Sequence, residues 1–111
     1  MRTPWGIADS VELLGKHGIK RIDTPSHGGY WVPAKARELM PKEALKTFAG
    51  LGWYEEDGDW ALVALSFPDL FRPEAVADAR ITIAKWHSPA VCAAFEITPD
   101  PNSFYRERKE V

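Results

Sequence analysis

The sequence has little cysteine, no long apolar run and no large excess of charge of either sign. Cys92 is the single cysteine among 111 residues, which excludes an internal disulfide and a zinc site built from several cysteines. No apolar segment approaches the roughly 18 residues of a membrane span, and the first five residues lack the apolar core of a signal peptide. We therefore expect a cytoplasmic protein without membrane contact.

The charge is nearly balanced overall but unevenly distributed. The 14 basic and 16 acidic side chains give a formal net charge of -2, which provides no general attraction to nucleic acid. Residues 48–80 nevertheless carry seven acidic side chains against two basic ones. Such a region suits a basic partner or imitates nucleic acid, although a solvated surface is the simpler interpretation.

The length and composition are those of one small globular domain. Hydrophobic residues make up 45% and charged residues 27%, which argues against disorder. A chain of this length supports one modest core, so we expect a single domain over residues 1–111.

Three short segments have the composition of β-strands. Residues 10–14 alternate weakly, residues 15–18 (Gly-Lys-His-Gly) are a turn signal, and residues 19–22 follow as a second strand. This pattern predicts a β-hairpin. Residues 30–32 provide a third strand after a further turn.

The rest of the chain favours helices. Pro33 suits the first turn of a helix, Gly50 suits a left-handed helix end, and Ser88 before Pro89 is an N-cap signal. Expected helices cover residues 34–40, 42–49, 60–67, 73–87 and 90–96, and a last charged turn covers residues 104–110. The sequence therefore predicts an α+β fold, with a small antiparallel sheet of about three strands packed against four or five short helices.

Two of these helices need an argument of their own. The run at residues 60–67 is short enough for a buried strand, but the acids before it suit the positive end of a helix dipole, so we expect a helix. In the helix over residues 73–87, Val76, Ile83 and Trp86 fall roughly on one face.

Two stretches have an unusual composition. The first is Thr24-Pro25-Ser26-His27-Gly28-Gly29-Tyr30-Trp31, in which paired glycines indicate either a positive φ or the close approach of another group. The second is Trp53-Tyr54-Glu55-Glu56-Asp57-Gly58-Asp59-Trp60, in which four acids lie between two tryptophans. We expect these stretches to be spatial partners.

His27 is the first candidate for chemistry. Ser26 beside it suggests a nucleophile and base, but adjacent residues of an extended chain point in opposite directions, so hydrogen bonds to the turn backbone are favoured. With Glu55, Glu56 or Asp57, His27 is a candidate for a metal site or an acid–base pair. A structural hydrogen bond from His27 to one of these acids is the favoured alternative.

The other candidates favour structure or binding over catalysis. Cys92 lies on an apolar helix and is expected in the core. A possible basic and aromatic patch for single-stranded nucleic acid consists of Lys16, Lys20, Arg21, Lys35, Arg37, Tyr30 and Trp31. Its charges are scattered and partly neutralised, so a solvated surface is favoured and direct nucleic-acid binding is not expected.

Five tryptophans are too many for so small a core to bury completely. They are Trp5, Trp31, Trp53, Trp60 and Trp86. At least one of them should be partly exposed, and tryptophan is enriched among the residues that dominate binding interfaces. This favours a binding module.

Four motifs in a fixed order resemble an uncharacterised bacterial domain family. They are Thr3-Pro4-Trp5-Gly6, Thr24-Pro25-Ser26-His27-Gly28-Gly29, Trp53-Tyr54-Glu55-Glu56-Asp57 and Trp60-Ala61, and the likeness extends over nearly the whole chain. The resemblance implies a plasmid, phage or other mobile element, where small acidic proteins are often anti-CRISPR or antirestriction inhibitors. It implies no reaction and no catalytic residue.

The leading hypothesis is a non-enzymatic module that binds a host protein, such as a defence nucleoprotein complex, without metal or cofactor. Its expected binding residues are Trp53, Tyr54, Glu55, Glu56, Asp57, Asp59 and His27. The acids would meet Lys/Arg-rich surface of the partner, and Trp53 or Tyr54 would anchor the contact. The alternatives are a small hydrolase or metal-dependent enzyme using His27 with a carboxylate of residues 55–57, and a nucleic-acid-binding module using the hairpin lysines.

Overall fold

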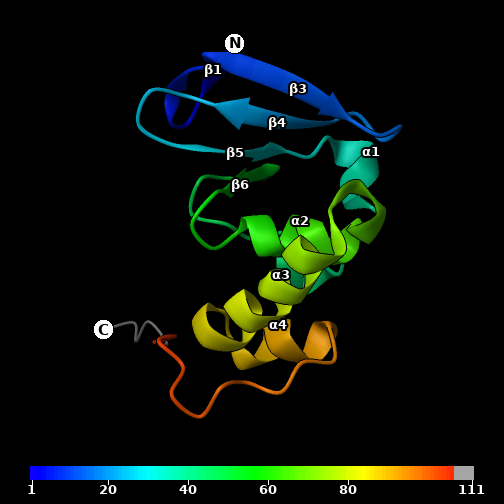
Figure 1. The fold of residues 1–111 in the computed structure, drawn as a ribbon, viewed down its shortest axis with the longest axis vertical. Coiled ribbons are helices and arrows are strands. Elements are labelled where there is room, and N and C mark those ends of the chain that lie inside the picture. Colours follow the sequence, from blue (N-terminus) through cyan, green and yellow to red (C-terminus); the bar gives the residue numbers. More distant parts are fainter. Residues whose placement is uncertain (107–111) are drawn as a thin grey trace.

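The computed structural model describes residues 1–106 and has an α+β fold, which confirms the expected class (Figure 1). The strands are β1 (Arg2–Thr3), β2 (Gly6–Ile7), β3 (Ser10–Leu14), β4 (Ile19–Asp23), β5 (Gly28–Trp31) and β6 (Trp53–Glu55). The helices are α1 (Ala34–Arg37), α2 (Trp60–Ser66), α3 (Pro73–Trp86) and α4 (Pro89–Ala94), with short 3-10 turns η1 (Lys42–Ala44) and η2 (Pro68–Leu70). No helix within residues 1–106 is long and apolar enough to cross a bilayer.

The main sheet is antiparallel with the strand order β3-β4-β5-β6, and β1 pairs with β2 in a separate ribbon. The expected hairpin is β3 and β4, and the expected third strand is β5. The sheet has a fourth strand, β6, at the start of the second unusual stretch, where no strand was expected. This strand forms because Trp53 lies opposite Trp31 and Tyr54 lies opposite Tyr30, so pairs of aromatic residues pack on both faces.

Alternation along the strands gives the sheet two different faces. Ile19, Tyr30 and Tyr54 belong to the main hydrophobic cluster with residues of α2 and α3. Trp31 and Trp53 point to the opposite face, here called the outer face, and remain partly exposed. The helices lie beside β5 and β6, whereas β3 forms the far edge of the sheet (Figure 1).

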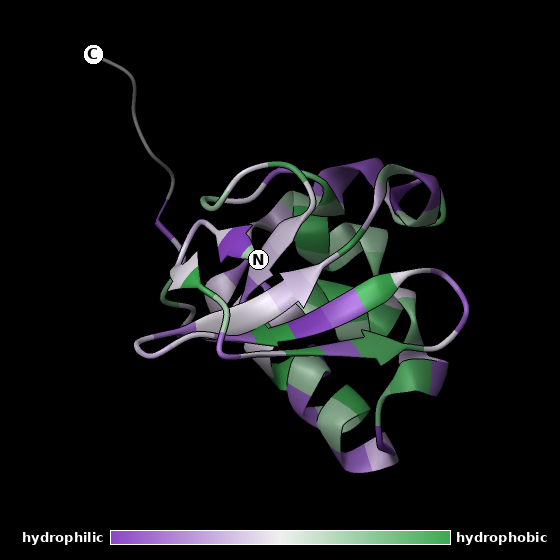
Figure 2. Ribbon diagram, turned by 90° about the horizontal axis from the view of Figure 1, so that it is seen from above, coloured by the Kyte–Doolittle hydropathy of each residue, from purple (hydrophilic) through white to green (hydrophobic). Residues whose placement is uncertain are grey.

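The core lies between the inner side of this sheet and the helices. The four residues from Ala61 to Ala64 of α2 are all buried, and α2 packs most extensively on α3. Hydrophobic residues, green in Figure 2, occur in the strands and in the helices beneath them, and several connecting turns are hydrophilic. The helix expected at residues 60–67 is therefore confirmed as α2.

Two expectations for the later helices have different outcomes. α4 begins as expected, because the Ser88 hydroxyl accepts a hydrogen bond from the Val91 N–H at 3.2 Å. Of the three residues expected on one face of α3, Ile83 is buried, whereas Trp86 is 53% exposed and stacks on Phe104 with ring centroids 4.6 Å apart. Ala79 and Ile83 form the buried stripe of α3, and Trp86 lies beyond its end.

The helices after β5 are shorter than expected. α1 ends at Arg37, and the helix expected at residues 42–49 is reduced to η1. Pro41 separates the two because it lacks an N–H and disfavours helical backbone in the residue before it. After η1, the Thr47 hydroxyl contacts the carbonyls of Gly50 and Trp53 at 2.8 Å. Residues 104–106 are not helical, and the rest of the expected last turn lies outside the described residues.

Candidate functional site

Thr24 holds the turn that precedes β5. Its hydroxyl donates to the His27 carbonyl at 2.7 Å and accepts from the His27 N–H at 3.1 Å, and its own N–H donates to the same carbonyl at 2.8 Å. The turn was expected to be held by the side chains of Ser26 and His27. This expectation is wrong: both residues are exposed, and their side chains make no hydrogen bond within residues 1–106.

The two glycines of this motif serve the close approach of other groups. Neither has a positive φ. A Cβ on Gly28 would lie 2.9 Å from the Ile22 carbonyl oxygen. A Cβ on Gly29 would overlap the Tyr54 carbonyl oxygen and the ring of Trp5. Of the two explanations for paired glycines, close approach therefore applies.

The two unusual stretches do lie side by side. The Glu56 N–H donates to the Gly28 carbonyl at 3.0 Å, one residue beyond His27. The His27 imidazole nevertheless makes no hydrogen bond or ion pair with a carboxylate of residues 55–57, so the expected structural hydrogen bond is not present. Within residues 1–106, no group of three or more His, Cys, Asp or Glu side chains is arranged to hold a metal ion.

The acids between Trp53 and Trp60 have different surroundings. The Glu55 carboxylate accepts the N–H groups of Asp57 and Gly58 at 3.1 and 2.9 Å, so it holds the loop between β6 and α2. Glu56 and Asp57 are exposed, and their carboxylates make no hydrogen bond or ion pair within residues 1–106. Asp59 is partly buried and lies in a cleft described below.

Tyr54 was expected among the binding residues, but its side chain does not reach the surface. It is completely buried, and its hydroxyl donates to the Ala44 carbonyl at 2.8 Å and contacts the Met40 sulfur at 3.5 Å. Burial raises the pKa of the Tyr54 phenol to about 12. Tyr54 therefore anchors β6 to the core, and Trp53 is the residue of this pair that faces outward.

Three tryptophans gather on the outer face, and we call them the tryptophan cluster: Trp5, Trp31 and Trp53. The rings of Trp31 and Trp53 have centroids 4.7 Å apart, and Trp5 meets Trp53 edge-on at 5.7 Å. All three rings are partly exposed. Arg37 covers one side of this cluster, because its guanidinium lies 5.6 Å from the Trp31 ring and donates to the Val32 carbonyl.

A cleft of about 760 Å³, here called the Asp59 cleft, lies between the loop after η1, the start of α2, the end of α3 and residues 104–106. Its polar and charged residues include Glu43, Lys46, Asp59, His87, Ser88 and Arg106. Burial, with a smaller contribution from the nearby Glu55 carboxylate, raises the pKa of Asp59 to about 6. Oε2 of Glu43 is buried and has no hydrogen-bond partner within residues 1–106.

His87 contributes an imidazole to the same cleft. Its Nε2 lies 3.0 Å from the Gly58 carbonyl oxygen. Because a carbonyl only accepts, this hydrogen bond requires the proton on Nε2 and leaves the lone pair of Nδ1 available in the neutral ring. Burial lowers the pKa of His87 despite the opposing effect of this hydrogen bond, which favours the neutral form.

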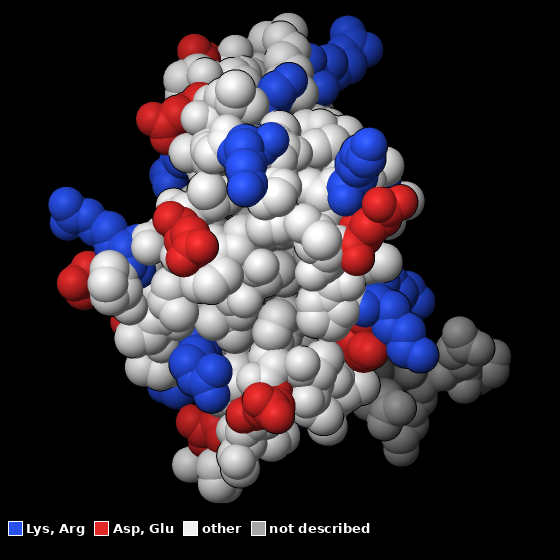
Figure 3. Space-filling model, turned by 90° about the vertical axis from the view of Figure 1, so that its right-hand side faces the viewer, with Lys and Arg blue, Asp and Glu red and all other residues white. Residues whose placement is uncertain are grey.

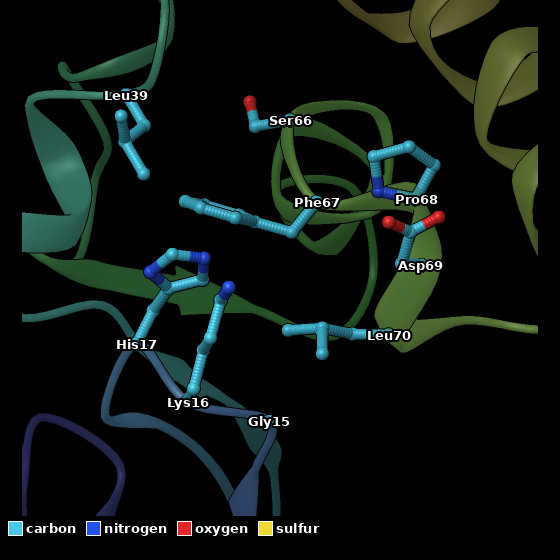
Figure 4. A pocket seen from close by; sticks show the side chains of 9 residues that line it. All are labelled: Gly15, Lys16, His17, Leu39, Ser66, Phe67, Pro68, Asp69 and Leu70. Carbon is cyan, nitrogen blue, oxygen red and sulfur yellow. The ribbon is translucent and has the colours of Figure 1, made fainter.

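A second hollow, of about 580 Å³, separates the turn between β3 and β4 from the end of α2 (Figure 4). The rings of His17 and Phe67 are in contact there, with their centroids 5.6 Å apart and their planes tilted by 46°. The side chains of Leu39 and Leu70 lie on either side of them (Figure 4). The lining is mainly apolar. Ser66 contributes a buried hydroxyl without a hydrogen-bond partner within residues 1–106.

The basic residues of the hairpin region do not form a separate patch. Arg21 lies 3.8 Å from the Asp23 carboxylate and donates to the Tyr30 hydroxyl, and Arg37 is engaged with Trp31 and Val32. On the side of α1 and the turn between β3 and β4, basic and acidic side chains alternate around a broad uncharged area (Figure 3). On this face, the basic side chains of the described residues therefore do not form a continuous track.

The site that sequence reasoning missed is the Asp59 cleft. Glu43, Asp59 and His87 come from three separate segments, and no spacing rule links them. Cys92, by contrast, is where it was expected: its sulfur is completely buried and lies 3.4 Å from the Ile83 carbonyl oxygen, and burial raises the pKa of its thiol.

A family model matches the whole chain. It is described as a domain of unknown function (DUF7007), and the match covers residues 1–111. No curated protein and no solved structure matches the sequence significantly. The arrangement of the chain's own residues is therefore the basis for a functional argument.

Proposed function

The chain belongs to the DUF7007 family, and because that family has no assigned function, we propose one from the surface of this member: it is a non-enzymatic protein-binding module. The observation that carries the proposal is the partly exposed tryptophan cluster on the outer face of the sheet. Tryptophans supply a large share of the binding free energy at protein interfaces, and packed rings that are already in place lose little entropy on binding.

The apolar part of this surface extends along the sheet. Register places Leu13 of β3 and Lys20 of β4 in one row with Trp31 and Trp53. Leu13 is 65% exposed and Val11, on the same face, is 46% exposed. Lys20 separates Leu13 from Trp31 in this row, but the exposed apolar residues share one face of the sheet, which favours an interaction surface.

The acids at the end of β6 favour a basic partner. Glu56 and Asp57 follow β6 directly, the Glu56 carboxylate lies near Gly28 and Asp23, and the exposed carboxylates of Glu56 and Asp57 make no ion pair within residues 1–106. A protein surface rich in lysine and arginine complements them, and such surfaces line the nucleic-acid channels of defence complexes. We therefore propose that the protein comes from a mobile element and inhibits a host defence nucleoprotein, of the CRISPR or restriction type, within the bacterial cytoplasm.

The test is capture of a host partner by the wild type and by variants in which the surface charge is changed and the fold is kept. The tagged protein is mixed with lysate of bacteria that contain CRISPR and restriction systems, and bound proteins are identified and quantified by mass spectrometry. The test variant is Glu56→Lys with Asp57→Lys. The control is Glu74→Lys with Asp78→Lys, which changes the net charge equally on the exposed side of α3.

The proposal expects stoichiometric capture of one Lys/Arg-rich defence subunit by the wild type and the α3 control. Capture should fall at least tenfold in Glu56→Lys/Asp57→Lys and in Trp53→Ala, while all proteins remain folded by circular dichroism. Equal capture by wild type and Glu56→Lys/Asp57→Lys would contradict the acidic contact. Equal capture by Trp53→Ala would contradict the role of the tryptophan cluster.

A further inference from the structure

The Asp59 cleft has an interior that offers acceptors to a ligand. The Asp59 carboxylate makes no hydrogen bond or ion pair within residues 1–106. Oε2 of Glu43 is buried without a partner, so a ligand reaches it only if the Glu43 side chain turns toward the cleft. His87 adds the lone pair of Nδ1, because Nε2–H is committed to the Gly58 carbonyl. These three side chains come from η1, the start of α2 and the end of α3, and they line one cleft.

Some donors in the same cleft are engaged elsewhere. The Thr47 hydroxyl is used by the carbonyls of Gly50 and Trp53. The Arg106 guanidinium donates to the carbonyls of Ser103 and Tyr105 in its own segment. The hydroxyls of Ser88 and Tyr105 also line the cleft, and neither donates a hydrogen bond within residues 1–106. A ligand that enters the cleft therefore meets the Asp59 carboxylate and the His87 imidazole together with these two hydroxyls.

Aromatic rings form part of the wall. Trp86 and Phe104 stack on each other at the side of the cleft, and Phe48 lies on the loop after η1. Ring faces attract organic cations, especially where carboxylates are close by. We infer that the Asp59 cleft binds an organic cation with several N–H donors, a guanidinium or primary ammonium group, between Asp59, Glu43 and His87. This site is separate from the tryptophan cluster and does not depend on the proposed function.

The cation would change the ionisation of the cleft. Burial raises the pKa of the Asp59 carboxyl to about 6, so this group is protonated in part of the molecules near that pH. A bound cation favours its charged form. The other titratable or charged groups around it are Glu43, Lys46, Glu55, His87 and Arg106. Binding should therefore weaken about tenfold between pH 7.5 and pH 5.0, because about one Asp59 in ten is ionised at the lower pH.

The experiment is a titration of the uniformly ¹⁵N-labelled full chain, followed by chemical-shift changes of the backbone amides and the Trp86 indole. Three probes are used at pH 7.5: agmatine, N-acetyl-arginine methylamide and the uncharged analogue N-acetyl-citrulline methylamide. Each is titrated into the wild type, Asp59→Asn and the control Asp78→Asn. Asp78 is exposed on α3 and does not line the cleft, so its variant has the same charge change outside the cleft.

The inference expects saturable shifts centred on Asp59, Trp86 and His87 with a guanidinium probe, and no saturation with the citrulline probe. Affinity should fall at least tenfold in Asp59→Asn and remain within twofold in Asp78→Asn. Binding of the blocked arginine as tightly as agmatine would identify a protein side chain as the source of the cation, and binding of agmatine alone would identify a free amine.

Two results would overturn the inference. One is the absence of saturable shifts with both charged probes. The other is equal affinity of wild type and Asp59→Asn. Neither result bears on the capture experiment, because that experiment changes the charges of Glu56 and Asp57 and the ring of Trp53.

Discussion

The ring of Trp5 packs on Gly29, in the space that a side chain on residue 29 would occupy. Trp5 comes from the turn between β1 and β2, so this contact fixes the small ribbon on the outer face of the main sheet. Ile22, which lies opposite Gly29 on β4, is completely buried although it is not part of the main hydrophobic cluster. The missing side chain at residue 29 is therefore what allows the tryptophan cluster to assemble.

We expect Gly29→Ala to lower the free energy of unfolding by about 2 kcal/mol or more, because the new methyl group overlaps the Trp5 ring and the Tyr54 carbonyl. Gly58→Ala is the control, since its nearest atom outside the adjacent residues is 4.0 Å from the new Cβ. Urea denaturation followed by tryptophan fluorescence measures both. Equal stability of the two variants would show that Trp5 moves aside without a penalty.

Removing the Thr24 hydroxyl should also destabilise the domain. Thr24→Val keeps the shape but leaves the N–H and carbonyl of His27 without that partner, which should lower stability by about 1–2 kcal/mol. Ser26→Ala and His27→Ala should change stability by less than about 0.5 kcal/mol, because both side chains are exposed and unpaired within residues 1–106. Thermal denaturation of the three variants measures these changes in stability. A large loss of stability in His27→Ala would contradict the assignment of the turn to Thr24.

Tyr54→Phe separates a structural role from a binding role. Loss of the hydroxyl leaves the buried Ala44 carbonyl without its donor, so we expect a loss of about 1–2 kcal/mol. Tyr105→Phe is the matched control, because Tyr105 has no side-chain hydrogen bond within residues 1–106. Capture of a partner should be unchanged in both variants, and reduced capture by folded Tyr54→Phe would restore Tyr54 to the interface.

The raised pKa of Asp59 predicts a pH dependence of stability with a defined sign. The folded state holds a proton on Asp59 up to about pH 6, whereas the unfolded chain releases it near pH 4, so this residue makes folding less favourable as pH rises from 4 to 6. Asp59→Asn should remove that effect and stabilise the domain at pH 7 by at most about 3 kcal/mol.

His87 contributes in the opposite direction. Its lowered pKa means that the unfolded chain takes up the imidazole proton first, so stability is lost as pH falls below about 6.5. Only the difference between wild type and Asp59→Asn isolates Asp59. Denaturation curves at pH 4.5, 5.5, 6.5 and 7.5 provide it, and a difference that stays constant with pH would exclude the raised pKa.

Local patterns predicted most of the elements of the fold. The Gly15 to Gly18 turn and the Ser88 cap each act within a few residues, and the hairpin and α4 follow from them. α2 was also predicted correctly, but the Asp59 side chain makes no capping hydrogen bond at its start. β6 was missed because three residues give too short a pattern, and its strand character depends on Tyr30 and Trp31 across the sheet. Reading Trp53, Tyr54 and Glu55 as an alternating strand would have predicted that Tyr54 points inward.

The candidate site was less predictable because it depends on tertiary contacts. The proximity of the two unusual stretches was correctly expected, but the partner of each side chain was not: Thr24 holds the turn, and Glu55 holds its own loop. His87 reaches Gly58 across 29 residues, and no local signal indicates that contact. The raised pKa of Asp59 likewise depends on burial beneath segments that are distant in the sequence.

The reactivity of the buried Cys92 thiol reports how often the domain opens. Its thiol is completely buried and lies against the Ile83 carbonyl, so a thiol reagent in the solvent reaches it only when α3 and α4 separate. The labelling rate therefore measures the free energy of that separation without a dye or a substitution. It also means that a new surface cysteine reacts before Cys92, so a fluorophore can be attached to it in a time short compared with opening of the domain.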